Sequence, residues 1–261
     1  MKKFPLFMVI ILTLAVILTA CVEHKNLNPN EIAIVNGDAI TVEKVKEKLA
    51  TFQLEKALYE YNGFQNNIYR NLELLHLRRD LIDHIIHLLK EQKLEEAKNF
   101  ISSLEDYEDI ETLKYFLLKE IDHYGQILDK QDNVITAFEE VLKDLMLMQE
   151  AKNRSLVPTE KEIQASYKDY LLSNQEKITT NIYYEYFHTF RLSKEKELFH
   201  LDTEDDYHSY ELQKIKKELI LQKLTKELGT YQLDRYIKNQ LKESHIIVNK
   251  KYDQYKNHFS S

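Results

Sequence analysis

Glycine and proline are so scarce in this chain that they constrain its fold class more than any other feature. Only 4 glycines and 3 prolines occur among 261 residues, where average usage gives about 18 and 13. Tight hairpins need these residues in their turns, which argues against sandwiches and barrels. A doubly wound nucleotide-binding fold is also disfavoured, because its phosphate loop needs glycine. We therefore expect a mainly α protein, with long helices joined by short polar connections.

The charge balance excludes one class of partner. The chain carries 36 Lys and Arg against 43 Asp and Glu, a formal charge of −7. Non-specific nucleic-acid binding needs a basic face, so we expect no nucleic-acid partner. The charges of both signs are interspersed, which is typical of a solvated surface.

The N-terminus has the organisation of a bacterial lipoprotein signal peptide. A basic Met1–Lys3 precedes the apolar run Phe4–Leu18, and Leu18-Thr19-Ala20-Cys21 resembles a lipobox. The resemblance implies that residues 1–20 are removed and that a diacylglycerol is attached to Sγ of Cys21. The protein is then extracytoplasmic and held on the bacterial cell membrane by this lipid.

An uncleaved membrane helix is the alternative for this segment. The apolar run is at the short end of what spans a bilayer, and Pro5 interrupts its start. Cys21 is the only cysteine in the chain, and lipidation would leave no thiol for a disulfide within one molecule. Beyond it we expect a polar tether over 21–31, a helical domain over 32–248 and a loose polar tail over 249–261.

Two short segments predict a small β element. Ile32–Val35, an Asn36-Gly37 turn and Ala39–Thr41 form the strongest hairpin signal in the chain. His245–Val248 is a second β-branched run near the C-terminus. Strands this short need partners, so we expect the strand near Ile34 to pair with the one near Ile247.

Apolar periodicity predicts the helices. A first helix follows Thr41 and ends at Asn62-Gly63, and one central helix runs from about 68 to 100 with two apolar stripes. Thr159 and Glu162 form a capping box. Whether 178–190 is helix or strand stays open, and 200–208 is expected to be an acidic loop. Further helices are expected around 113–128, 134–148, 163–170, 212–228 and 233–241.

Several segments resemble one family of extracytoplasmic foldases. Ile32–Thr41 resembles the start of the SurA/PrsA chaperone domain, which opens with a strand, an Asn-Gly turn, Ile-Thr and a helix. The resemblance implies a SurA/trigger-factor-like chaperone domain of many helices, with a small β element that pairs the N- and C-terminal strands. Further segments that resemble this domain are Leu81–Asp83, Glu95–Lys98, Leu145–Lys152, Val157–Ile163, Ile215–Leu224 and Leu241–Asn249.

The chain departs from this family in one respect. Foldases of the family often carry a parvulin prolyl-isomerase domain, which is a glycine-rich sheet domain of about a hundred residues. The glycines here are isolated, and only 13 residues follow Val248, where a parvulin-like first strand would begin its domain. We therefore expect no isomerase domain and no enzymatic activity, so that the protein binds rather than converts its partner.

The densest aromatic patch, residues 183–190, is the candidate surface for binding clients. Exposed rings give a large contact area at low entropy cost, and methionines adapt to varied partners. The alternative is that these side chains pack the core. The candidate client-binding residues are Tyr183, Tyr186, Phe187, Phe190, Met146 and Met148.

No metal or cofactor is expected. Asp80, Asp83, His84 and His87, with His76 two turns earlier, have helical spacing that could bring ligands together. These are the polar positions between the two apolar stripes, so a solvated polar face explains them fully. The acidic segment 200–208 lacks the alternating ligands and central glycine of a calcium loop.

Two functions therefore compete. The first is a membrane-anchored lipoprotein that binds unfolded or secreted polypeptides as a non-catalytic chaperone. The second is an interaction lipoprotein that scaffolds one dedicated extracytoplasmic partner, and a second copy of the chain is a further candidate partner. A solute-binding lipoprotein fits poorly, because such proteins are two-lobed α/β proteins rich in turns.

Overall fold

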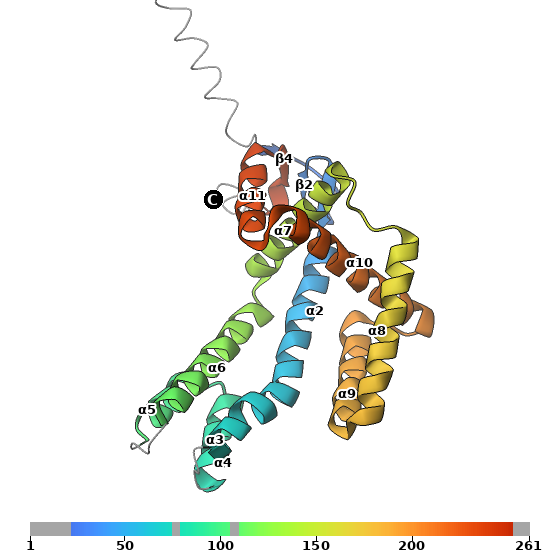
Figure 1. Ribbon diagram of the computed structural model, residues 1–261. Coiled ribbons are helices and arrows are strands. Elements are labelled where there is room, and N and C mark those ends of the chain that lie inside the picture. Colours follow the sequence, from blue (N-terminus) through green and yellow to red (C-terminus); the bar gives the residue numbers. More distant parts are fainter. Residues whose placement is uncertain (1–21, 75–78, 105–109, 253–261) are drawn as a thin grey trace, which may run out of the picture. The chain divides into compact units, whose positions relative to one another are not determined.

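The computed structural model describes residues 22–74, 79–104 and 110–252 (Figure 1). The predicted leader, Cys21, His76 and most of the predicted tail lie outside these ranges. The protein is mainly helical, as expected, and carries one small sheet. Among the described residues, no helix combines the length and the apolar character that crossing a bilayer requires.

The chain divides into two compact units. Unit 1 contains the residues up to 48, 134–172 and those from 204 onward, and unit 2 contains 49–133 and 173–203. Helices α2 (Val42–Leu58) and α8 (Glu160–Thr180) each run from one unit into the other. We describe each unit by itself.

Unit 1 is built around a four-stranded sheet of order β1-β4-β2-β3. The strands are β1 (Val22–Lys25), β2 (Glu31–Val35), β3 (Asp38–Thr41) and β4 (Ile246–Asn249). β2 and β4 are antiparallel, with Ile34 opposite Ile247, which confirms the predicted pairing of the two ends of the domain. β4 thereby has a neighbour on each side, and its backbone groups are satisfied.

Strand β1 corrects the predicted tether. Val22–Lys25 pairs in parallel with β4, with Val22 opposite Ile246, so the chain enters the sheet immediately after residue 21. The open edge of β4 offers a row of backbone partners that sequence composition does not reveal. The predicted tail also begins too early, because Asn249 belongs to β4 and its side chain amide donates to the carbonyl of Glu31 at 2.8 Å.

The turn between β2 and β3 matches its sequence signal. Asn36 and Gly37 have φ values of 52° and 90°, the two positive values that a tight hairpin of this kind needs. Thr41 then caps α2, since its Oγ1 accepts from the backbone N–H of Lys44 at 3.3 Å.

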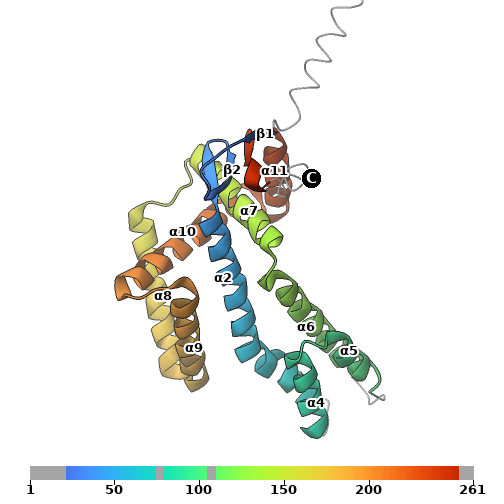
Figure 2. The ribbon, with the colours of Figure 1, turned by 180° about the vertical axis from the view of Figure 1, so that it is seen from behind.

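Three helices pack together in unit 1, and one of them contacts the sheet. They are α7 (Val134–Asn153), α10 (Glu204–Leu228) and α11 (Thr230–Glu243), and α7 contacts β3 as well as the other two helices. Figure 2 shows them from the opposite side. Their buried side chains form the core of the unit, and include Phe138, Val141, Ile215, Leu224, Leu233 and Ile237.

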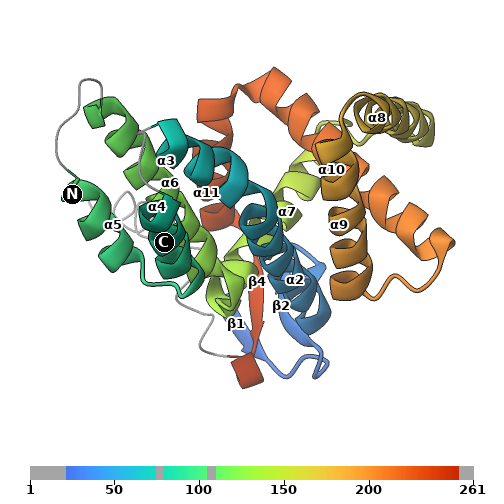
Figure 3. The same cartoon turned by 90° about the horizontal axis from the view of Figure 1, so that it is seen from below.

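Most of unit 2 is a helical core built on one continuous stretch of chain, residues 49–133. After α2 come η1 (Tyr59–Tyr69), α3 (Arg70–Leu74), α4 (Arg79–Lys90), α5 (Leu94–Ser102) and α6 (Ile110–Gln131). Figure 3 shows α3 to α6 grouped together. The last part of α8 and the whole of α9 (Ile182–Phe199) complete the unit. Its core includes Ile68, Leu72, Ile85, Leu89, Ile101, Leu117, Ile121 and Tyr124.

The predicted single helix over 68–100 is wrong. The chain turns between α4 and α5, where Gln92 adopts a left-handed φ of 60°. The backbone N–H groups of Gln92 and Lys93 donate to the carbonyls of Leu89 and Leu88, a Schellman motif that ends α4. The apolar spacing continues across the turn because α4 and α5 both face the same core, so periodicity alone joins them.

The predicted stop at Asn62-Gly63 is also wrong. The chain continues through it as a π-helix, η1. A side chain on Gly63 would place its Cβ 2.7 Å from Cδ2 of Tyr59, so glycine at this position makes room for the Tyr59 ring. The glycine serves packing here and not helix termination.

The remaining predictions concern helices in the C-terminal half of the chain. The capping box is confirmed: the backbone N–H of Thr159 donates to Glu162 Oε2 at 2.7 Å, and the N–H of Glu162 donates to Thr159 Oγ1 at 3.3 Å. The undecided segment 178–190 is helical apart from Asn181. The expected loop 200–208 is largely wrong, because α10 begins at Glu204, where three acidic residues suit the positive end of the helix dipole.

Candidate functional site: an exposed aromatic face on helix α9

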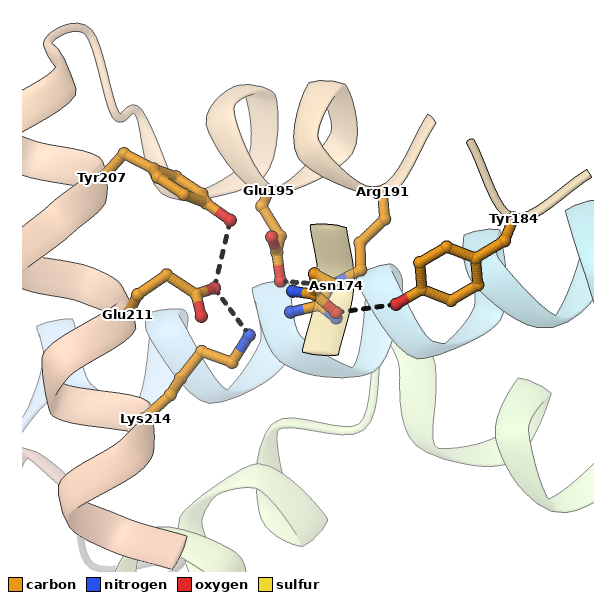
Figure 4. Close-up of polar contacts among 7 residues, drawn as sticks. All are labelled: Asn174, Tyr184, Arg191, Glu195, Tyr207, Glu211 and Lys214. Atoms are coloured by element: carbon orange, nitrogen blue, oxygen red, sulfur yellow. Dashed lines mark hydrogen bonds and ion pairs between the residues drawn. The ribbon is translucent and has the colours of Figure 1, made fainter. Parts of the chain in front are cut away.

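The hairpin between α8 and α9 is held by polar contacts at its connection. Asn181 caps α9 by accepting from the backbone N–H groups of Tyr183 and Tyr184 at 3.0 and 3.3 Å. Tyr184 Oη donates to Oδ1 of the buried Asn174 at 2.8 Å, and so ties the first turn of α9 to α8 (Figure 4). These contacts fix the start of α9 and hence the direction of its side chains.

Further along α9 a carboxylate is buried. Glu195 is fully buried, and its Oε1 accepts from Nε of Arg191 at 3.1 Å (Figure 4). A buried carboxylate is tolerated only when it is paired and hydrogen-bonded. Glu195 is therefore engaged in holding the fold.

Unit 1 contains a second buried carboxylate. Glu211 of α10 accepts from Lys214 Nζ at 3.0 Å and from Tyr207 Oη at 3.2 Å (Figure 4). As with Glu195, the charge is compensated by its own helix. Both carboxylates are thus structural groups, and we assign neither of them to a reaction.

The outward face of α9 is apolar and exposed. Tyr183 is 81% exposed, Tyr186 60% and Ile182 58%. Residues 182, 183 and 186 lie within one turn of each other, so the three side chains share one side of the helix. Two of the predicted client-binding residues, Tyr183 and Tyr186, therefore lie on the surface and not in the core. We call Ile182, Tyr183 and Tyr186 the α9 aromatic face.

Phe187 and Phe190 lie differently from the α9 aromatic face. Both are half-buried, and both pack against Tyr61 of η1, with ring centroids 4.1 Å apart for Phe190 and 6.3 Å for Phe187. The Tyr61 and Phe190 rings are stacked nearly parallel, at 10°. Sequence reasoning missed Tyr61, because it lies more than a hundred residues from α9 and carries no motif of its own.

The two methionines do not join this surface. Met146 is 4% exposed within α7, where it packs near Oγ of Ser244, so its proposal as a client contact is corrected to a core role. Met148 is half-buried on the same helix. Both belong to unit 1, whereas the aromatic candidates belong to unit 2, so the six residues do not form one site within either unit.

A pair of tyrosines locks the π-helix against α6. Tyr59 and Tyr124 stack with ring centroids 5.6 Å apart. Tyr59 Oη donates to Glu120 Oε2 at 2.8 Å, and Tyr124 Oη donates to Glu60 Oε1 at 2.6 Å. Burial, and then the adjacent carboxylate, raises the pKa of each phenol above its ordinary value. Both tyrosines therefore keep their protons at neutral pH and act as hydrogen-bond donors.

The polar cluster on α4 lies on the surface. Asp80, Asp83, His84 and His87 are all exposed. His87 Nε2 lies 3.1 Å from Glu91 Oε1, and the His84 ring packs edge-on against Phe100. Across residues 22–74, 79–104 and 110–252, no cluster of three or more His, Cys, Asp or Glu side chains is arranged to hold a metal ion.

Comparison with known proteins identified no relative of the chain. No protein-family model, no curated protein and no solved structure matches the chain. The α9 aromatic face is therefore judged on its own geometry. Three large side chains with apolar surface are exposed together on one side of this helix, which makes the face the candidate binding surface.

Proposed function

We propose that this protein is a membrane-anchored lipoprotein that binds unfolded or exported polypeptides without catalysis. The lipid on Cys21 supplies the anchor, and the α9 aromatic face supplies the binding surface. The proposal places the chain near the SurA/PrsA foldases, as a chaperone-like relative without the parvulin domain.

The α9 aromatic face carries the proposal. An apolar side chain that does not pack in the core can be replaced by a polar one without loss of stability. A cluster of such side chains on the surface therefore indicates an interaction. Tyr183 and Tyr186 are amphipathic, with an apolar ring and a polar tip, which suits contact with varied sequences in water. Further along the same helix, Phe190 stacks on Tyr61 and Phe187 packs against it at a tilt, which holds α9 against η1 within unit 2.

A second observation supports the family resemblance. Segments that resemble the foldase chaperone domain contact one another in unit 1, although they are far apart in sequence. Asn36 Nδ2 donates to Gln149 Oε1 and to Ser244 Oγ, both at 3.1 Å, and Asn36 Oδ1 accepts from the N–H of His245 at 2.9 Å. Gln149 in turn donates to the carbonyl of Val35 at 2.8 Å. The segments that carry the resemblance are thus linked by hydrogen bonds around Asn36, and we call these contacts the joint of unit 1.

Suppression of client aggregation tests the binding function. We expect the purified mature protein to slow the aggregation of several unrelated unfolded proteins. Tyr183→Ser with Tyr186→Ser should weaken this effect, because each ring removed takes apolar contact area from the surface. Circular dichroism should show unchanged helicity, since neither ring is packed inside the unit.

The matched control removes two rings elsewhere in unit 2. Tyr115 and Phe116 of α6 are 54% and 52% exposed, and they are replaced by Ser in the control variant. Equal loss of activity in both variants would show that any exposed ring contributes, and would contradict a defined surface on α9. One tight partner in a pull-down, with no effect on unrelated clients, would favour the scaffold alternative. Prolyl-isomerase activity of the pure protein on a short Xaa-Pro peptide would contradict binding without catalysis.

Replacement of Cys21 tests the anchor. Cys21→Ser removes the sulfur that would carry the diacylglycerol, so we expect the protein to accumulate unprocessed or to leave the membrane fraction. Fractionation and mass spectrometry of the N-terminus measure this directly. A processed variant that stays on the membrane would rule out Cys21 as the anchor.

A further inference from the structure

Helix α11 presents a row of basic side chains to solvent. Arg235, Lys238 and Lys242 are spaced three and four residues apart, so they lie on one face of the helix, and all three are exposed. Asp234, which precedes Arg235 and lies four residues before Lys238 in the sequence, is an acidic neighbour of the row. The exposed neighbour Asn239 is neutral, and Glu243 is an exposed carboxylate at the end of the helix. We call Arg235, Lys238 and Lys242 the α11 basic row.

The other side of α11 is committed to the core of unit 1. Leu233 and Ile237 are buried, and the helix contacts α7 and α10. Tyr236 Oη donates to Glu150 Oε2 at 2.7 Å, which ties α11 to α7. The basic row is therefore held outward by packing on the opposite face.

The α11 basic row lies close to Val22, the first described residue after the predicted lipid anchor. Helix α11 ends at Glu243, three residues before Ile246, and Ile246 lies opposite Val22 in the parallel pair of β1 and β4. Figures 1 and 2 show α11, β1 and β4 at the same end of unit 1. Neighbouring strands are about 4.8 Å apart, so Val22, the residue that follows Cys21 in the sequence, lies about one strand spacing from Ile246.

We propose that the α11 basic row binds the anionic phospholipid headgroups of the bilayer that holds the lipid on Cys21. This inference rests on the anchoring part of the proposed function. Positive charge distinguishes this face from the chain as a whole, which has a formal charge of −7 and is repelled by an anionic surface. The basic row is therefore the part of unit 1 that we expect to turn toward the headgroups. The row orients unit 1 on the membrane, while the lipid supplies the attachment.

The dimensions suit this contact. Lys242 lies seven positions after Arg235, which is a rise of about 10 Å along the helix at 1.5 Å per residue. Electrostatic screening in physiological salt acts over about 8 Å. A row this short can meet the headgroups along its whole length when α11 lies parallel to the bilayer surface. A basic face on an amphipathic helix is a recurrent arrangement at membrane surfaces.

A fluorescent label on α11 tests the proposal. The lipidated protein carrying Asn239→Cys, with an environment-sensitive label on the new thiol, is reconstituted into vesicles. One set contains phosphatidylcholine alone, and the other contains phosphatidylcholine mixed with phosphatidylglycerol. We expect the emission to shift to shorter wavelength only in the mixed vesicles and to return at high salt. Arg235→Gln with Lys238→Gln and Lys242→Gln should lower the ratio of docked to undocked protein about a hundredfold, at roughly fivefold per charge.

The matched control changes the net charge equally at other places in unit 1. Lys46 of α2 and Lys161 and Lys168 of α8 are exposed and are replaced together by Gln. The control variant should keep the emission shift. Equal emission in the two kinds of vesicle, or equal loss of the shift in the control, would overturn the proposal. A shift produced by added poly-glutamate in phosphatidylcholine vesicles would assign the row to acidic polypeptides, and would also overturn it.

Failure of this inference can be told apart from failure of the proposed function. The variant without the basic row should suppress client aggregation as well as the unchanged protein, because the α9 aromatic face is intact. A free thiol at Cys21 in the purified protein, detected by mass spectrometry, would overturn the anchoring and this inference with it. Loss of client binding with an intact emission shift would overturn the chaperone function alone.

Discussion

Unit 1 and unit 2 are stabilised in different ways. Unit 1 joins the two ends of the described chain: β4 lies between β1 and β2, and the side chain of Asn36 bridges α7 and the segment before β4. Unit 2 relies mainly on contacts within one stretch of chain, where α3 to α6 enclose an apolar core and two stacked tyrosines fix the π-helix. The first arrangement depends on residues far apart in sequence, and the second on residues close together.

This difference separates stability from the candidate function. The α9 aromatic face belongs to unit 2, whose core is complete without Ile182, Tyr183 and Tyr186. Surface rings of this kind can change without loss of the fold. The joint of unit 1, in contrast, uses single polar side chains that each serve several partners. Substitutions on the α9 aromatic face should therefore weaken binding with little effect on stability, and substitutions at the joint of unit 1 should do the reverse.

The largest effect is expected in the core of unit 2. Ile85 is fully buried in α4, and Ile85→Ala removes apolar contacts and leaves a cavity. We expect the free energy of unfolding of unit 2 to fall by about 2–5 kcal/mol. Hydrogen exchange followed by mass spectrometry should show faster exchange in α4 to α6 and retained protection in β2 and β4. Equal loss of protection in β4 would show that the two units unfold together.

A slightly smaller effect is expected at the joint of unit 1. Asn36→Ala removes three side-chain hydrogen bonds and places alanine at a φ of 52°. We expect the free energy of unfolding to fall by about 2–4 kcal/mol. Asn36→Gly keeps the backbone conformation available and loses only the bonds, so denaturant unfolding should find it more stable than the alanine variant. Equal stability of the two variants would show that the backbone conformation costs nothing here.

High pH should weaken the packing of η1 against α6 in unit 2. The pKa values of Tyr59 and Tyr124 are raised above 10 in the folded state by burial and by the adjacent carboxylates. Their contribution to stability is complete below pH 10 and is lost as pH rises further, because the unfolded chain then releases the protons first. Hydrogen exchange in α6 measured at rising pH checks this. Tyr59→Phe with Tyr124→Phe should make the fall above pH 10 shallower, and an unchanged slope would exclude the two phenols as its cause.

Loss of the capping box should have a modest effect on α8. Thr159→Ala removes the hydroxyl that accepts from the N–H of Glu162, and we expect a cost of about 1 kcal/mol. Thr159→Ser keeps the hydroxyl and serves as the control. Thermal unfolding should rank the alanine variant below the serine variant, and identical midpoints would contradict a role for the box in stability.

The smallest effect on stability is expected on the α9 aromatic face. Tyr183 is 81% exposed, so Tyr183→Ser should change the free energy of unfolding by less than about 0.5 kcal/mol. Chemical denaturation measures this, with Phe190→Ser as the comparison, because that ring stacks on Tyr61. A large loss of stability in the Tyr183 variant would show that this ring is packed, and would remove the separation of binding from stability.

Particular residues show how far sequence reasoning reached. The Asn36-Gly37 turn, the Thr159 capping box and the opposition of Ile34 and Ile247 were all predicted and are confirmed. The site was predicted less well. Tyr183 and Tyr186 are exposed, as a binding surface requires, whereas Met146 lies in the core. The sequence around Tyr61, whose ring stacks on Phe190, contains no motif that would have identified it.

The sequence by itself determined what depends on a few adjacent residues. Scarce glycine and proline imply helices, an Asn-Gly pair implies a turn with two positive φ values, and Thr and Glu three residues apart imply a capped helix start. Tertiary structure alone decided the turn at Gln92, the strand Val22–Lys25 and the outward direction of the α9 aromatic face. Each of these depends on contacts that form only when the chain is folded. The spacing of apolar residues is the same whether one helix continues or two helices fold back on the same core, so the spacing does not locate a turn.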